Sequence, residues 1–212
     1  MTKQLSLALN VVLAVALVAV GAALITSNNG SDADTEEPAT QAEQAGEWTQ
    51  IAPTDLDDNP FALFRDAMAL AVGDSTATNA MAIGWGELGV LWGRERPVVT
   101  VYVEERRFTK HLMDENEYFT VEAFDKDYDR VIRYLGSVSG RDEDKIVGSG
   151  LTLIRTEHGA PAFDEGRLLL ECRKIYQAPF DPAGFGDVPK EVYSDRPLHT
   201  MYIGEITAAY VK

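Results

Sequence analysis

The stretch NAMAIGWGELGVLWG, residues 79–93, contains the spacing G-x-G-x-x-G at Gly84, Gly86 and Gly89. In dinucleotide-binding proteins, glycines so spaced turn a buried strand tightly into a long helix whose N-terminus faces the pyrophosphate. The residues that follow here, VLWGR at 90–94, are too few and too broken by glycine to begin such a helix. No regular alternation of strands and helices surrounds the stretch, so a Rossmann-type dinucleotide site is not expected.

Hydrophobic patterning elsewhere predicts a mainly β fold. Alternating or β-branched runs predict strands, and apolar residues at i, i+3 and i+4 predict short helices. The predicted strands are 67–72, 97–103, 118–124, 151–155, 167–178 and 199–211. The predicted helices are 61–66, 108–116, 127–135 and 141–147, and 180–197 is expected to be a long surface loop. About six strands with few helices and no β-α-β alternation indicate a barrel or a sandwich.

The segment NAMAIGWG, residues 79–86, also resembles the flavin-binding loop of the flavin reductase-like family, the FMN-binding split β-barrels that include flavoredoxins. Further blocks similar to the family follow in the same order: VVTVYV at 98–103, RFT at 107–109, SGRDEDK at 139–145 and MYIGEI at 201–206. The resemblance covers residues 60–212. It implies an FMN-binding split β-barrel of Greek-key topology with a few short flanking helices, assembled as a homodimer with FMN at the subunit interface.

The resemblance also implies the residues that bind FMN. Small residues let a backbone approach a ring system, and Arg107 and Thr109 are suitable phosphate donors near the start of a predicted helix. The candidate cofactor-binding residues are Asn79, Ala80, Met81, Ala82, Ile83, Gly84, Trp85, Arg107, Thr109, Ser139, Gly140, Arg141, Lys145 and His199. Relatives often carry Thr or Ser where this chain has Ala82 and Gly84, so those hydroxyl groups are missing here. No catalytic residue is predicted.

Structural roles compete with these assignments. Thr109 could simply belong to the first turn of a helix, and Ser139 with Asp142 resembles a capping box. Trp85 and Trp92 suit the core or a dimer interface, and Met81 suits the core. Cys172, the single cysteine, is expected to be a small buried hydrophobe. The histidines at positions 111, 158 and 199 lack metal-ligand spacing, so no metal site is predicted.

The N-terminal residues predict a membrane or export segment. Residues 5–25 are almost wholly apolar and long enough to cross a bilayer, although Gly21-Ala22-Ala23 would also suit signal cleavage. Lys3 precedes this run and no Lys or Arg follows until Arg65, which predicts an extracytoplasmic domain, either membrane-anchored or exported after cleavage. The predicted organisation is an anchor or signal at 1–25, an acidic flexible linker at 26–58 and the split-barrel domain at 59–212.

These features together predict an FMN-dependent oxidoreductase that passes hydride or electrons outside the cytoplasmic membrane. Its electron donor would be a quinol, a cytochrome or NAD(P)H, and its location favours the first two. The alternative is a non-catalytic split-barrel module that binds flavin or haem. A net charge of −15 argues against nucleic acid as a partner.

Overall fold

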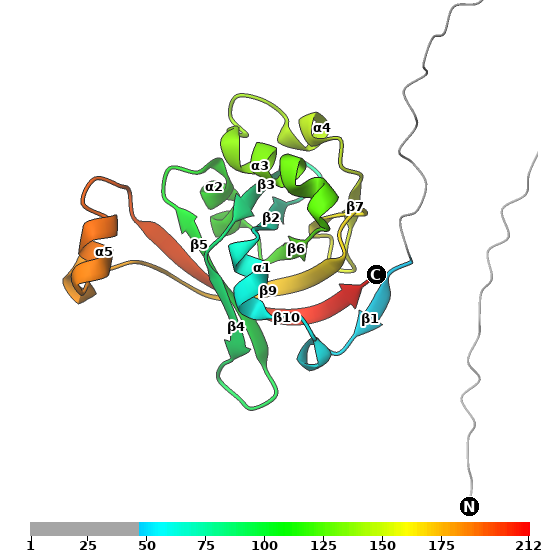
Figure 1. The fold of residues 1–212 in the computed structure, drawn as a ribbon, viewed down its shortest axis with the longest axis horizontal. Coiled ribbons are helices and arrows are strands. Elements are labelled where there is room, and N and C mark those ends of the chain that lie inside the picture. Colours follow the sequence, from blue (N-terminus) through cyan, green and yellow to red (C-terminus); the bar gives the residue numbers. More distant parts are fainter. Residues whose placement is uncertain (1–46) are drawn as a thin grey trace, which may run out of the picture. The chain divides into compact units, whose positions relative to one another are not determined.

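The computed structural model describes residues 47–212, shown in Figure 1. The predicted membrane or signal segment and most of the predicted linker lie outside these residues. Within the described residues, no helix has the length and apolar character required to cross a bilayer.

Ten strands make up two antiparallel sheets in the described part of the chain. The strands are β1 (Thr49–Ile51), β2 (Met68–Gly73), β3 (Thr78–Ile83), β4 (Gly86–Val90), β5 (Pro97–Glu104), β6 (Tyr118–Ala123), β7 (Leu153–Arg155), β8 (Pro161–Phe163), β9 (Leu168–Pro179) and β10 (His199–Val211). The large sheet has the order β3-β2-β6-β9-β10-β5-β4, with β1 added alongside β10, and β7 pairs with β8. The long strand β10 therefore pairs with β9, β5 and β1.

Short helices cover parts of this sheet and connect its strands. They are α1 (Pro60–Arg65), α2 (Phe108–Glu115), α3 (Asp129–Ser137), α4 (Lys145–Ser149) and α5 (Asp187–Val192). Three 3-10 turns are η1 (Pro53–Asp55), η2 (Lys126–Tyr128) and η3 (Pro182–Gly184). The Asn59 side chain accepts a hydrogen bond from the Phe61 N–H, so it caps α1. The Asp144 side chain caps α4, and the Ser139 hydroxyl has a related structural role in the turn before it, where it accepts a hydrogen bond from the Arg141 N–H at 3.2 Å.

All six predicted strands are present, but several short elements were missed. Strands β3 and β4 flank the Gly84–Trp85 turn; glycines obscure the alternation of β4, and the Asn and Ala residues of β3 are depleted in strands. Strand β8 is too short to show a period. Strand β1 pairs with β10, so the flexible linker predicted to end at residue 58 ends earlier. The predicted surface loop at 180–197 contains α5, which lies away from the barrel on an extension between β9 and β10 (Figure 1).

Strand β2 is buried on both faces and divides the core into two parts. Its larger side chains belong to the barrel interior, whereas Ala69 and Ala71 join a second cluster with Ile132 and Leu135 of α3. Small side chains on this face let the helix pack close to the sheet. Ala80 of β3 is fully buried in the same second cluster, so its small size is explained by helix packing and not by a neighbouring flavin.

Buried carboxylates attach the β7–β8 hairpin to the large sheet. The backbone N–H of Phe163 donates to Glu122 Oε2 at 3.0 Å, and the N–H of His158 donates to Glu171 Oε1 at 3.1 Å. The Thr120 hydroxyl donates to the Pro161 carbonyl at 2.6 Å. Both carboxylates are fully inaccessible to solvent. Burial raises the pKa of Glu122 from 4.5 to about 8, so this group retains its proton at neutral pH.

We predict that this proton makes stability depend on pH. The folded state holds the Glu122 proton more tightly than the unfolded chain, so the free energy of unfolding should fall as pH rises from 4.5 to about 8. The slope from this group approaches about 1.4 kcal/mol per pH unit. Glu122→Gln keeps an acceptor for the Phe163 N–H and cannot ionise. In urea unfolding at several pH values, this variant should show a flatter profile than the wild type. Equal slopes would contradict the assignment.

Candidate functional site

The candidate site lies where the large sheet fails to close. Strand β3 stands at one end of the strand order and β5 near the other, and in the described residues β3 pairs only with β2. In an antiparallel strand, alternate residues direct their N–H and C=O groups to each side. The second edge of β3 therefore offers unpaired backbone groups to the space between β3 and β5.

Two adjoining cavities occupy this space, and together they form the cleft described below. The larger, of ≈ 340 Å³, is lined by Asn79, Met81, Glu104, Arg106, Arg107, Phe108, Thr109, Ser137, Val138, Ser139, Gly140, Arg141 and Lys145. The smaller, of ≈ 180 Å³, is lined by Met81, Ala82, Ile83, Gly84, Trp85, Tyr102, Glu104, Arg107 and His199. Met81, Glu104 and Arg107 line both cavities, so the cavities form one elongated cleft.

The structure gathers almost all of the candidate residues around this cleft. Of the predicted set, only Ala80 lines neither cavity. Residues that line the cleft but were not predicted are Tyr102, Glu104, Arg106, Phe108, Ser137 and Val138. Glu104 and Arg106 are charged residues just after the predicted strand at 97–103, and this position could have indicated that they line the site. Ser137 and Val138 carry no comparable signal, because only the end of α3 brings them to the cleft.

The larger cavity concentrates positive charge: of the four cations that line it, only Arg106 pairs with an acidic group, Glu104. Arg107 donates to the Gly136 carbonyl at 3.4 Å, Arg141 to the Arg106 carbonyl at 2.9 Å, and Lys145 to the Leu135 carbonyl at 2.7 Å. Across residues 47–212, none of these three cations lies within ion-pair distance of a carboxylate. A cluster of this kind is suited to an anion such as a phosphate.

Lys145 gives the strongest indication that the cavity binds an anion, because it is the most buried of these cations. Its side chain belongs to a residue only 4% exposed, and a buried ammonium group without a counter-ion is costly. Burial, together with the nearby positive charge of Arg107, lowers the pKa of Lys145 from 10.5 to about 8. A phosphate in the cavity would supply the missing negative charge.

A buried hydrogen bond shapes the same cavity. The Asn79 Nδ2 donates to the Thr109 Oγ1 at 2.8 Å and links β3 to the first turn of α2. The Thr109 oxygen accepts in this bond, so its own hydrogen stays available for a ligand. Gly140 packs so closely here that an added Cβ would lie 2.3 Å from Asn79 Oδ1 and 2.7 Å from the Phe108 ring. Only glycine fits at this position without a shift.

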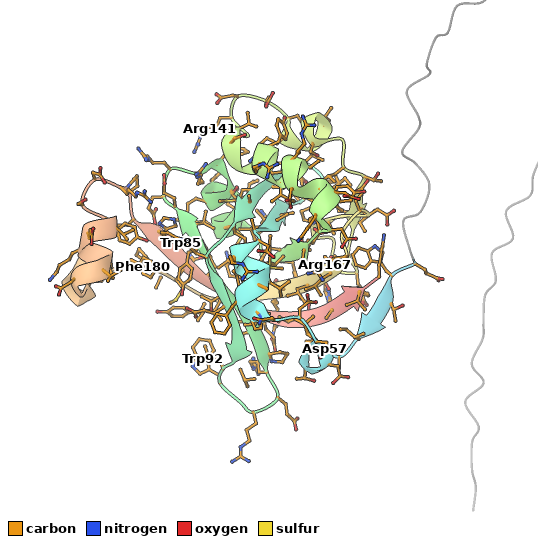
Figure 2. The ribbon with its side chains drawn as sticks, in the orientation of Figure 1. Asp57, Trp85, Trp92, Arg141, Arg167 and Phe180 are labelled. Atoms are coloured by element: carbon orange, nitrogen blue, oxygen red, sulfur yellow. The ribbon has the colours of Figure 1, made fainter. Side chains whose placement is uncertain are left out.

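An aromatic pair lies at the other end of the cleft. The rings of Trp85 and His199 have centroids 4.9 Å apart, and the Tyr193 hydroxyl lies 3.0 Å from His199 Nδ1. Burial lowers the pKa of His199 below its ordinary value of 6.5. The ring is therefore neutral at pH 7. Trp85 is 45% exposed, so its predicted placement in the core is wrong. Figure 2 shows Trp85 next to Phe180, on the side of the barrel that carries α5.

The chain belongs to the flavin reductase-like domain family, whose sequence profile matches residues 71–212. This match confirms the predicted family and, with it, the split-barrel type of fold. No curated protein sequence shows significant similarity to the chain.

Solved structures agree with this assignment. The chain is 27% identical to flavoredoxin from Methanosarcina acetivorans, with a TM-score of 0.55 over 69% of this chain and 68% of that one. It is 26% identical to flavoredoxin of Desulfovibrio vulgaris (Miyazaki F), with a TM-score of 0.55 over 69% of each chain. An FMN-binding protein from Thermus thermophilus shares the fold at 18% identity, with a TM-score of 0.54 over 69% of this chain and 71% of that one. These comparisons support FMN, the cofactor that the sequence predicts.

We predict that Lys145 makes phosphate binding depend on pH. Its ammonium group must be charged to stabilise a phosphate, so the affinity for FMN should fall as pH rises through about 8. Between pH 7 and 9 the loss should approach about tenfold, because the phosphate itself is already a dianion there. Lys145→Gln should weaken binding by about tenfold at pH 7 and remove this pH dependence. Titrations that follow quenching of FMN fluorescence measure both effects.

The matched control is Lys126→Gln, which removes one exposed positive charge outside the cleft. This variant should keep the wild-type affinity and pH profile. If both variants lowered the affinity equally, a general effect of net charge would explain the result and the specific role of Lys145 would be refuted.

Proposed function

We propose that this protein is an FMN-dependent oxidoreductase of the flavin reductase or flavoredoxin type. The observation that carries the proposal is the set of three cations without acidic partners in a cleft that also exposes the free edge of β3. FMN combines a phosphate dianion with a flat ring whose edge carries hydrogen-bonding groups, so it matches both ends of the cleft. When bound, the flavin supplies the capacity to accept and release hydride or single electrons.

Each part of the cleft has a separate task in this proposal. Arg107, Arg141 and Lys145, with the Thr109 hydroxyl, would hold the phosphate. The backbone of β3 and of the Gly84–Trp85 turn would hold the polar edge of the ring, which makes the missing hydroxyl groups at positions 82 and 84 dispensable. His199 closes the far end of the cleft, where its neutral ring can accept or donate a hydrogen bond beside the reacting region.

We also propose a homodimer. The hairpin of β4 and β5 projects from the barrel (Figure 1), and near its end Val90 and Trp92 are 54% and 59% exposed. Exposed large apolar side chains on a projecting strand pair are typical of an interaction surface. A second copy of the chain that covers this hairpin would bury them and would protect the edge of β4.

The proposed location is the outer face of the cytoplasmic membrane, with the domain either anchored there or exported. The support comes from the apolar run at residues 5–25 and the charge distribution around it. Pyridine nucleotides are cytoplasmic, so a quinol or a cytochrome is the favoured electron donor over NAD(P)H at this location.

The proposal is tested on the full-length protein purified under anaerobic conditions. We expect the protein to bind FMN with a characteristic flavin absorbance, and to lose that absorbance when a quinol or a reduced cytochrome is added. Rapid bleaching by NADH in stopped flow would contradict the proposed donor and location, while it would leave the oxidoreductase class intact. A protein that binds FMN and is bleached by no donor would favour the non-catalytic flavin-binding module, and one that binds haem instead would favour the haem-binding form.

A further inference from the structure

An apolar groove lies beside the cleft, between the barrel and the extension that carries α5. The groove has a volume of ≈ 440 Å³, and its walls include the side chains of Trp85, Phe180, Phe185, Val188, Val192 and Tyr193. This volume lies within the range of small-molecule sites, and pockets lined by aromatic and aliphatic groups are typical of such sites. Val188 on the wall of this groove is 72% exposed, so a molecule in the groove could contact it.

The groove shares a wall with the cleft. Trp85 lines both spaces, and Tyr193 of the groove lies 3.0 Å, hydroxyl oxygen to Nδ1, from His199 of the cleft. A molecule in the groove would therefore be separated from the cleft by little more than one aromatic ring. Such proximity is what an electron donor to a cofactor in the cleft requires.

The chemistry of the groove disfavours anionic donors. Its lining contains no Lys, Arg or His, and its one carboxylate, on Asp181, accepts a hydrogen bond from the Ala183 N–H at 2.9 Å. The phosphates of a pyridine nucleotide would find no cation there and would meet a like charge. The ring of Tyr193 stacks on Phe185 at a centroid distance of 5.3 Å, and Phe180 contacts Phe185 edge-on at 6.1 Å. Aromatic walls in these orientations are suited to a flat, uncharged ring.

On the basis of the proposed function, we propose that this groove binds the ring of a hydroquinone, which donates electrons to FMN in the adjacent cleft. The hydroquinone loses two electrons and two protons and leaves as the quinone, and the oxidised flavin takes up the two electrons and two protons. The Tyr193 hydroxyl and the His199 ring lie between the two spaces, where they can carry a hydroxyl proton. Lipid-soluble quinones also suit a domain whose sequence carries the apolar run at 5–25.

Binding is tested with a short-chain ubiquinone as the probe, added to the full-length protein already loaded with FMN. Quenching of tryptophan fluorescence should be saturable, because Trp85 forms part of the groove. Val188→Asp places a charge on the exposed wall and should raise the Kd for the quinone at least tenfold. Val147→Asp is the matched control, since Val147 is 78% exposed and lies outside both the groove and the cleft, and it should leave this Kd unchanged.

A second measurement separates this proposal from the proposed function. The Kd for FMN, measured on the same variants, should be unchanged in Val188→Asp. The anaerobic rate at which ubiquinone at low concentration reoxidises the dithionite-reduced flavin, the downhill direction of the same exchange, should fall at least tenfold. FMN binding without saturable quinone binding would overturn the groove proposal alone, whereas failure to bind FMN would overturn the function. If Val188→Asp changed the oligomeric mass and not the quinone affinity, the groove would be covered by a second copy and the proposal would be wrong.

Discussion

The incomplete closure of the sheet is the constraint on which the rest of the structure depends. Because β3 and β5 face each other without pairing, the edge of β3 keeps backbone groups that the ladder does not use. The first turn of α2 and the segment at 137–145 line this gap, and a buried hydrogen bond from Asn79 to Thr109 joins β3 to α2. Closing the barrel would satisfy the backbone and remove the cleft. The fold thus leaves a local deficit of hydrogen bonds for a ligand to complete.

Three of the positive charges around the cleft lack an acidic partner among residues 47–212, as the second edge of β3 lacks a pairing strand. Three cations are held by backbone carbonyl oxygens and none is neutralised by an acid in the described part of the chain, even though the protein as a whole carries a net charge of −15. Keeping a buried ammonium group such as that of Lys145 uncompensated lowers the stability of the empty protein. A bound anion would recover that free energy, so ligand binding and folding stability are coupled. Glu104, the one carboxylate that lines the cleft, pairs with Arg106 and not with these three cations.

The sequence was most informative where one strand could be recognised by itself. The ends of β10 were predicted to the residue, because β-branched and aromatic residues recur along its length. Strand β4 was missed because it contains glycines, and β8 because it has only three residues. Strand β3 was missed because its sequence, TNAMAI, carries Asn and Ala, which are depleted in strands. Ala80 was assigned to the ligand because a pattern shows that a residue is small but not which face of the sheet meets α3. The burial of Lys145 arises only from the packing of α3 and α4, so no local pattern indicates it.

The extension that carries α5 leaves and rejoins the sheet at one point. Pro179 at the end of β9 pairs with Thr200 near the start of β10. The pairing of β9 with β10 therefore does not depend on the roughly twenty residues between them. Insertions, deletions or exchanges in that segment would leave the barrel and the cation-lined cavity intact, because no residue of 180–198 lines that cavity. Changes in this segment would therefore alter what approaches the Trp85 end of the cleft without altering the residues that line the cation-rich cavity. The segment between β9 and β10 can thus vary in length and sequence independently of the barrel.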